Sequence, residues 1–74
     1  MQPIAFQGYV KVGRTYYNSE KISKIKEHRT GEAPTLIFFD NGEVESVPEV
    51  KNSRKFIENL NTVSITNGIL DYEA

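Results

Sequence analysis

Hydrophobic and polar positions alternate over residues 9–12, and β-branched and aromatic residues fill positions 15–17. Alternation with a period of two is typical of a strand that buries one face, and such residues favour strands. Gly13 and Arg14 stand between the two segments, so the pattern predicts a tight hairpin. Residues 22–28 carry two isoleucines three positions apart, a spacing that fits either one helical turn or a strand with a bulge. The segment is short for a helix, and we therefore predict a bulged strand.

The most apolar run of the chain, residues 35–39, follows a loop of glycine, proline and polar residues and is expected to be the central strand. Asn41 and Gly42 come directly after it. They are the strongest short-range signal for a hairpin, because a type I′ turn needs positive φ at both central residues. Residues 43–47 would return as the paired strand, and Pro48 ends it because proline cannot donate a hydrogen bond to the ladder.

After this strand the pattern changes to that of a helix. Apolar side chains fall on one helical stripe over about residues 54–60, and Asn52 or Ser53 can cap its start. We expect this short helix to pack on the sheet. Residues 62–66 alternate again, and a second asparagine–glycine pair separates them from residues 69–72. This last segment is predicted to be a second hairpin, or else a tail.

These elements predict an α+β fold in one small domain over residues 1–74, with a core over residues 4–60 and a C-terminal hairpin or tail over residues 61–74. The expected architecture is a twisted antiparallel sheet of about five strands, an SH3-like or barrel-like meander, with one short packed helix and a C-terminal hairpin. A chain of 74 residues buries only about 60% of its unfolded surface, which excludes a second domain. Because the chain has no cysteine, packing or self-association must stabilise this small core.

Charge is distributed unevenly, although the whole chain carries only −1. Residues 1–31 hold six lysines and arginines against two glutamates, which gives +4, whereas residues 32–74 hold three against eight carboxylates, which gives −5. The two halves can neutralise each other across one folded surface, or the basic half can form a functional face. No segment is apolar over the roughly 18 residues that a membrane span needs, and no signal-peptide pattern occurs. We expect a cytoplasmic protein without a membrane partner.

The residues that enzymes use are scarce in this sequence. His28 is the only histidine, and it is interpreted as a solvated loop residue. Glu43 and Glu45 would share one strand face, as an acid–base pair or a cation site requires, but the solvent side of an outer strand has the same pattern. Neither a glycine-rich phosphate loop nor a calcium-loop pattern occurs. We predict no catalytic residue, no metal site, no cofactor and no enzymatic activity.

One set of residues combines aromatic rings with positive charge, as platforms for single-stranded nucleic acid do. Alternation places Tyr9 and Lys11 on the face opposite Val10 and Val12, and one of the two adjacent tyrosines that follow must lie in the core. The candidate interaction face consists of Tyr9, Lys11, Arg14, Tyr16, Lys24, Lys26 and Arg29.

A protein partner explains the same residues. A small sheet has two edges whose unpaired backbone groups can pair with another chain, and tyrosine and arginine anchor many interfaces. We therefore predict a non-catalytic protein–protein interaction or regulatory accessory module of a bacterial or phage system that self-associates, with a homodimer as the expected form. The alternative is a small domain that binds single-stranded RNA or DNA through the basic and aromatic face. The acidic second half opposes this alternative, because it repels a polyanion.

A further pattern is formed by residues 17–25, residues 34–42, Val47, Phe56 and Ile57. It resembles the small bacterial flagellar and swarming-motility accessory proteins of the FlbD/SwrD type, over residues 9–60. Those proteins share an N-terminal strand, an asparagine followed by an isoleucine pair, a threonine-led strand into a glycine turn, and a closing helix. The resemblance implies an accessory, non-enzymatic role and no catalytic residue. The chain departs from the pattern in its longer loop at residues 31–34 and in its sequence after residue 61.

Overall fold

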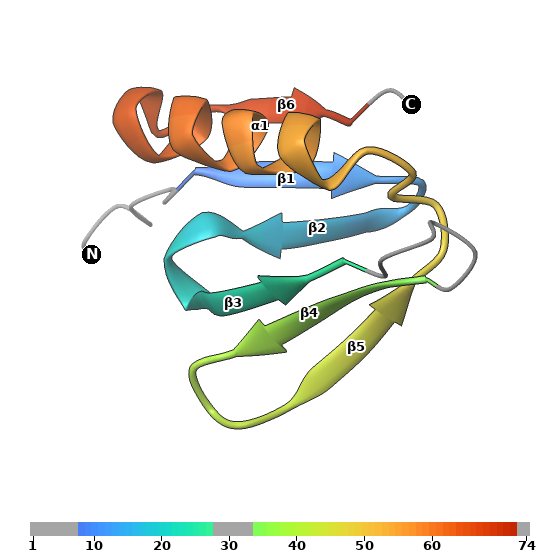
Figure 1. Ribbon diagram of the computed structural model, residues 1–74. Helices are drawn as coiled ribbons and strands as arrows, with labels where there is room; N and C mark the ends of the chain where they lie inside the picture. Colours follow the sequence, from blue (N-terminus) through green and yellow to red (C-terminus); the bar gives the residue numbers. More distant parts are fainter. Residues whose placement is uncertain (1–7, 28–33, 73–74) are drawn as a thin grey trace.

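In residues 8–27 and 34–72, which the computed structural model describes, the chain forms six strands, one α-helix and one short 3-10 helix (Figure 1). The strands make two sheets of three strands each, the first with the order β2-β1-β6 and the second with the order β3-β4-β5. The predicted α+β class is confirmed. In chain order the elements are β1 (Tyr9–Val12), β2 (Thr15–Asn18), η1 (Ser19–Lys21), β3 (Ile22–Lys26), β4 (Thr35–Phe39), β5 (Val44–Val47), α1 (Ser53–Thr66) and β6 (Ile69–Asp71).

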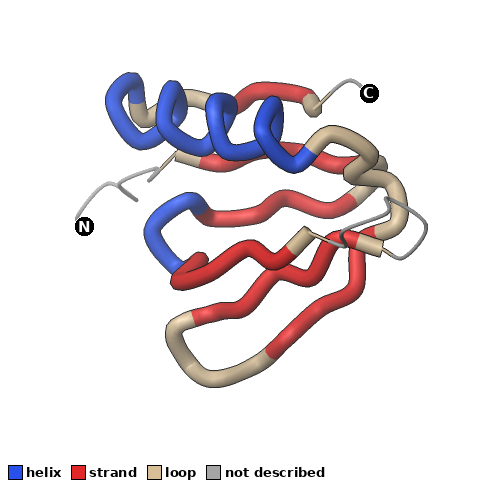
Figure 2. The backbone as a smooth tube through the Cα atoms, viewed as in Figure 1, coloured by secondary structure: helices blue, strands red, loops and turns tan. Residues whose placement is uncertain are grey.

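The prediction of a single sheet is wrong, because the chain leaves the first sheet between β2 and β3. Asn18 is extended, and its side chain accepts a hydrogen bond from the backbone N of Glu20 at 3.0 Å, which begins the turn η1. The turn carries the chain away from β2, and among the described strands β3 pairs only with β4. Figure 2 shows η1 as the connection between the two groups of strands.

The first sheet has β1 in its middle. β1 pairs antiparallel with β2, as the predicted hairpin requires, and parallel with β6. Gly13 takes a φ of 61° in the turn between β1 and β2, a conformation that glycine adopts without steric cost. The predicted alternation is confirmed, because Val10 and Val12 are buried while Tyr9 and Lys11 on the other face are half-buried.

The second sheet is an antiparallel meander with β4 in its centre, as predicted. The bulge expected in β3 is also confirmed, because the pairing with β4 changes register between Ile22 and Lys24. Ile22 and Ile25 both pack against the core as partly buried side chains. The bulge therefore brings two residues three positions apart to the same side of a strand.

The turn between β4 and β5 differs from the predicted type I′ turn. Phe39 N donates to Glu43 O at 2.8 Å, which leaves three loop residues, and of these only Gly42 has a positive φ, at 89°. Asn41 instead uses its side chain, which accepts a hydrogen bond from Glu43 N at 2.9 Å. At Asn41, a local side-chain contact thus replaces the positive φ that a type I′ turn requires at both central residues.

The predicted C-terminal hairpin is wrong, because α1 continues through residues 62–66. Val63 follows Leu60 by three positions on the stripe that includes Phe56, and its complete burial outweighs the strand-like alternation of the segment. Asn67 takes a φ of 56°, and its N–H donates to Val63 O at 2.8 Å. The second asparagine–glycine pair therefore ends a helix and does not form a hairpin turn.

The ends of α1 are fixed by neighbouring residues. The Asn52 side chain accepts a hydrogen bond from Lys55 N at 3.1 Å, as expected of a helix cap. The backbone N of Asn52 donates to the Tyr72 hydroxyl at 2.8 Å. Further along, α1 approaches β1 so closely that a Cβ added at Gly8 would lie 2.0 Å from the backbone oxygen of Val63. Only glycine fits at that position.

The core lies where α1 and the two sheets meet, and Phe56 is fully buried within it. The Phe56 ring meets Tyr17 edge-on at 6.2 Å between centroids and Tyr72 at 5.9 Å. Tyr17 in turn stacks on Phe39 at 6.3 Å, so aromatic rings connect the helix with both sheets. One of the two adjacent tyrosines is thus in the core, as predicted. Among residues 8–27 and 34–72, the buried hydrophobic side chains are those of Val10, Val12, Tyr17, Ile37, Val47, Val50, Phe56, Leu60, Val63 and Tyr72.

Candidate interaction surfaces

The outer face of the first sheet, which points away from α1, contains three of the predicted site residues. Tyr9 and Lys11 alternate with the buried valines of β1, and Tyr16 lies opposite Lys11 in the pairing with β2. Lys11 Nζ lies 5.6 Å from the centroid of the Tyr16 ring, and 52% of Tyr16 is exposed. On β6, Ile69 and Asp71 lie opposite Tyr9 and Lys11 and complete this face.

Lys24 and Lys26 lie on a different surface, the outer face of the second sheet. They stand opposite apolar residues of β4, and Lys24 Nζ lies 4.2 Å from the centroid of the Phe38 ring. Arg14 is exposed in the turn between β1 and β2, and Arg29 lies outside the described residues. The first sheet therefore brings together Tyr9, Lys11 and Tyr16. Lys24 and Lys26 belong to the second sheet.

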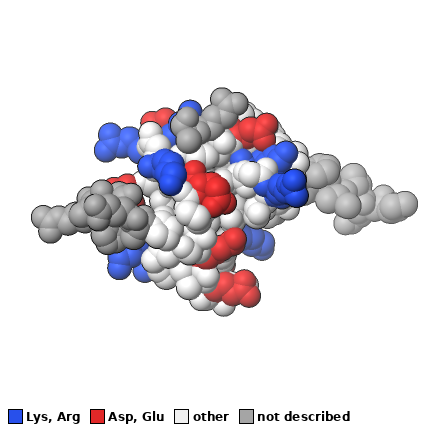
Figure 3. All heavy atoms as spheres, turned by 90° about the vertical axis from the view of Figure 1, so that its right-hand side faces the viewer, with Lys and Arg blue, Asp and Glu red and all other residues white. Residues whose placement is uncertain are grey.

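The acidic side chains at β5 point to the opposite side of the second sheet from these lysines. Glu45 pairs with the fully buried Ile37 and so shares its side of the sheet, and Glu43, two positions earlier, does the same. No ion pair joins a lysine or arginine to a carboxylate among residues 8–27 and 34–72. At the end of the molecule shown in Figure 3, basic and acidic side chains are interspersed. The described residues visible at that end form no continuous basic surface.

Glu45 contacts a buried tyrosine. The Tyr17 hydroxyl donates a hydrogen bond to Glu45 Oε1 at 3.1 Å, which joins β2 to β5. Burial of Tyr17, followed by the hydrogen bond and negative charge of Glu45, raises the pKa of Tyr17 to about 12. This carboxylate therefore has a structural role. In the described part of the chain, no group of three or more histidine, cysteine, aspartate or glutamate side chains could hold a metal ion.

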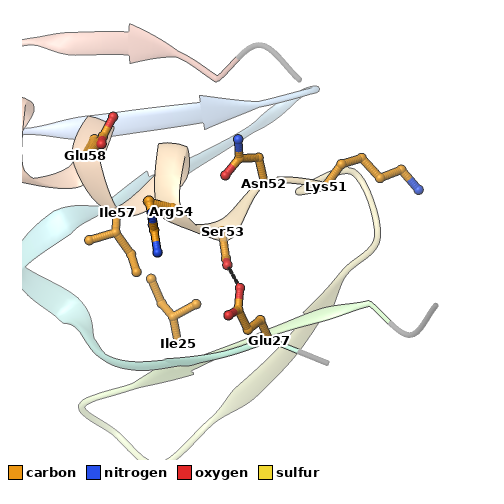
Figure 4. Close-up of a pocket in the computed structure, with 8 residues that line it drawn as sticks. All are labelled: Ile25, Glu27, Lys51, Asn52, Ser53, Arg54, Ile57 and Glu58. Atoms are coloured by element: carbon orange, nitrogen blue, oxygen red, sulfur yellow. Dashed lines mark hydrogen bonds between the residues drawn. The ribbon is translucent and has the colours of Figure 1, made fainter. Parts of the chain in front are cut away.

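An open groove lies between the start of α1 and the end of β3 (Figure 4). The Ser53 hydroxyl donates a hydrogen bond to the Glu27 carboxylate beside this groove. A serine nucleophile needs a base and a third group that orients the base, and none of the described residues lining the groove is a histidine. The contact joins the first residue of α1 to the residue that follows β3. The sequence gives no signal for it, because the two residues are 26 positions apart.

On β6, Ile69 and Leu70 are exposed on opposite faces of the first sheet, and Ile65 is exposed on α1. The exposed fractions are 82% for Ile65, 55% for Ile69 and 36% for Leu70. Among the described strands, β6 pairs only with β1, so it is an edge strand. Sequence reasoning missed these exposed residues because it placed residues 61–74 in a hairpin or tail. The available signal was the presence of three large aliphatic residues beyond the predicted core.

The chain matches no protein-family model, and comparison with curated proteins and with solved structures gives no match. The resemblance to the FlbD/SwrD type therefore stays a prediction. Within the described residues, no helix combines the length and apolar character needed to cross a membrane.

Proposed function

We propose that the protein is a non-catalytic interaction module, with a regulatory or accessory role in a bacterial or phage system, and that it self-associates. The observation that carries the proposal is the exposure of Ile69 and Leu70 on the edge strand β6. An edge strand offers unpaired backbone groups to another chain, and aliphatic side chains beside them favour burial.

The size of the domain supports the same proposal. Fully burying an aliphatic side chain stabilises a structure by about 1.5–3 kcal/mol, and Ile69 and Leu70, which are 55% and 36% exposed, gain only part of this in the isolated chain. The described residues include ten buried hydrophobic ones, which is a small core for a folded domain. Association would therefore contribute to folding as well as to function.

Sedimentation equilibrium tests this proposal. Over loading concentrations from about 10 µM to about 1 mM, where small interfaces form and dissociate, the average mass should rise above that of one chain. The rise should persist at high salt, because salt screens ionic contacts but not aliphatic ones. A mass equal to one chain over the whole range would contradict the proposal.

A second candidate function is binding of single-stranded RNA or DNA to the outer face of the first sheet. Tyr9, Lys11 and Tyr16 support it, because exposed rings can stack on bases while a lysine contacts phosphate. Asp71 on the same face opposes it, and so does the net charge of −1.

Fluorescence anisotropy with mixed single-stranded oligonucleotides at two salt concentrations tests the second candidate. Binding should weaken as salt rises, and Tyr16→Ala should weaken it by about 1–3 kcal/mol. Val44→Ala is the matched control, because Val44 is 53% exposed but lies on the second sheet. No binding at low salt would exclude the candidate.

A further inference from the structure

We propose that two copies of this chain join through β6, with the two β6 strands antiparallel and Leu70 facing Leu70 of the second copy. The first sheets of the two copies would then form one continuous sheet. The inference rests on the proposed self-association and identifies the strand, the register and the partner.

Within the described part of the chain, the outer side of the β6 backbone pairs with no strand and is open to a second copy. Tyr9 N donates to Gly68 O at 2.9 Å and Tyr72 N donates to Lys11 O at 2.8 Å, in the parallel register that sets Leu70 opposite Val10. In a parallel pair, alternate residues turn their N–H and C=O groups toward the neighbouring strand. Gly68, Leu70 and Tyr72 therefore face β1, and the N–H and C=O groups of Ile69 and Asp71 point to the free edge.

These free groups are complementary to a second copy of themselves. If Leu70 lies on a twofold axis, Ile69 of one copy stands opposite Asp71 of the other, and each such pair exchanges two N–H···O=C bonds. The pairing therefore satisfies both donors and both acceptors of each edge. Leu70 occupies the position between the bonded pairs, where opposite Cα atoms approach to about 4.5 Å.

The side chains fit the same arrangement. Leu70 lies on the α1 side of the sheet and Ile69 on the outer face, so β6 carries an exposed aliphatic residue on each side. In the pair, Leu70 contacts its own counterpart and both are removed from water. The contact is short, so association should be weak and dependent on concentration.

Charge distinguishes β6 from the edge strands of the second sheet. Two copies of β3 would bring Lys24 and Lys26 together, and two copies of β5 would bring their glutamates together, both of which are repulsive. On β6 the one charged residue, Asp71, lies opposite Lys11 of its own chain. This edge can therefore meet its own copy with little repulsion.

Cysteine cross-linking tests the register, because the chain contains no cysteine. Opposite Cα atoms at about 4.5 Å lie within the range of about 4.4–6.8 Å that a disulfide spans. Leu70→Cys should therefore form a disulfide-linked dimer under mild oxidation at least about tenfold faster than Val44→Cys or Ile65→Cys. Both controls are more exposed than Leu70, so faster reaction cannot come from accessibility. Equal rates for the three variants would overturn the proposed register.

A charge substitution provides the second measurement. Leu70→Lys places two lysines opposite each other and should weaken self-association by about tenfold, whereas Ile65→Lys should leave it unchanged. Circular dichroism reports whether each variant keeps its fold, and the cross-linking result decides the question if Leu70→Lys does not fold. If the chain self-associates but neither Leu70 variant differs from its control, the proposed β6 pairing is wrong and the proposed function still stands. A chain that stays monomeric would contradict both.

Discussion

The two sheets of this domain are held in place by different kinds of contact. The first sheet has α1 packed directly on β1 and β6, close enough to require Gly8. The second sheet comes from one continuous segment, residues 22–47, and joins the rest through a few side chains, among them the Tyr17–Phe39 stack and the hydrogen bond from Thr35 to Val50 O. The second sheet is therefore a locally formed unit whose attachment depends on single residues.

The largest loss of stability is expected when the fully buried ring of Phe56 is removed. Phe56→Ala should lower the free energy of unfolding by about 3–5 kcal/mol, because it leaves a cavity between Tyr17 and Tyr72. Ile57→Ala is the matched control next in the chain, and as a 42% exposed residue it should cost less than about 1 kcal/mol. Urea denaturation measures both, and equal losses would contradict the central role of Phe56.

A substitution at Gly8 acts on the contact between α1 and the first sheet. Gly8→Ala should lower the free energy of unfolding by about 1–3 kcal/mol, because its Cβ would collide with the backbone of Val63. Gly68→Ala is the control, because the nearest atom to its Cβ would be the side-chain oxygen of Thr66 at 3.3 Å. Thermal unfolding of the two variants gives the measurement. A Gly8→Ala protein as stable as Gly68→Ala would show that α1 can move away from β1.

The corresponding change on the second sheet is Thr35→Val. Its buried hydroxyl donates to Val50 O at 3.0 Å, and loss of this bond should cost about 1–2 kcal/mol. Native-state hydrogen exchange should show faster exchange in β4 and β5 with little change in β1. Ser46→Ala, at an exposed position of β5, is the control and should leave exchange unchanged. If hydrogen exchange becomes equally faster in both sheets, the two sheets open together and the second is not a separate unit.

The smallest effect at neutral pH is expected for Tyr17→Phe, which should cost less than about 1 kcal/mol. The pKa of Tyr17 is raised from 10.0 to about 12 in the folded chain. Above pH 10 the unfolded form ionises first, so the native protein should lose stability as pH rises from about 10 to about 12. Tyr17→Phe should lose less over this interval in urea titrations at each pH. An identical pH dependence in both proteins would contradict the raised pKa.

Elements whose residues interact with near neighbours could be predicted from the sequence. The hairpin of β1 and β2, the bulge in β3 and the Asn52 cap all follow from side chains within a few positions. The full length of α1 could not, because residues 62–66 alternate like a strand and only the burial of Val63 decides for a helix. The parallel pairing of β6 depends on that outcome.

The candidate interaction face could likewise be predicted only where it depends on residues close together in the sequence. Alternation alone places Tyr9 and Lys11 on one face, and hairpin pairing adds Tyr16. The separation of Lys24 from these residues could not be predicted, because it depends on the turn η1 that divides the sheets. The exposed edge of β6 was beyond prediction for another reason: an edge is defined by the absence of a neighbouring strand, which only the complete topology reveals.

The parallel pairing of β1 with β6 affects how the protein folds as it leaves the ribosome. Residues 9–47 emerge first and contain five of the six described strands, so the whole second sheet can form early. The pairing of Tyr9 with Ile69 and the contact of Phe56 with Tyr72, however, can form only after β6 has been synthesised. Contacts between residues so far apart in the chain form slowly. A nascent chain paused before β6 would therefore expose the backbone edge of β1. Chaperones that bind unpaired strands could then bind this edge.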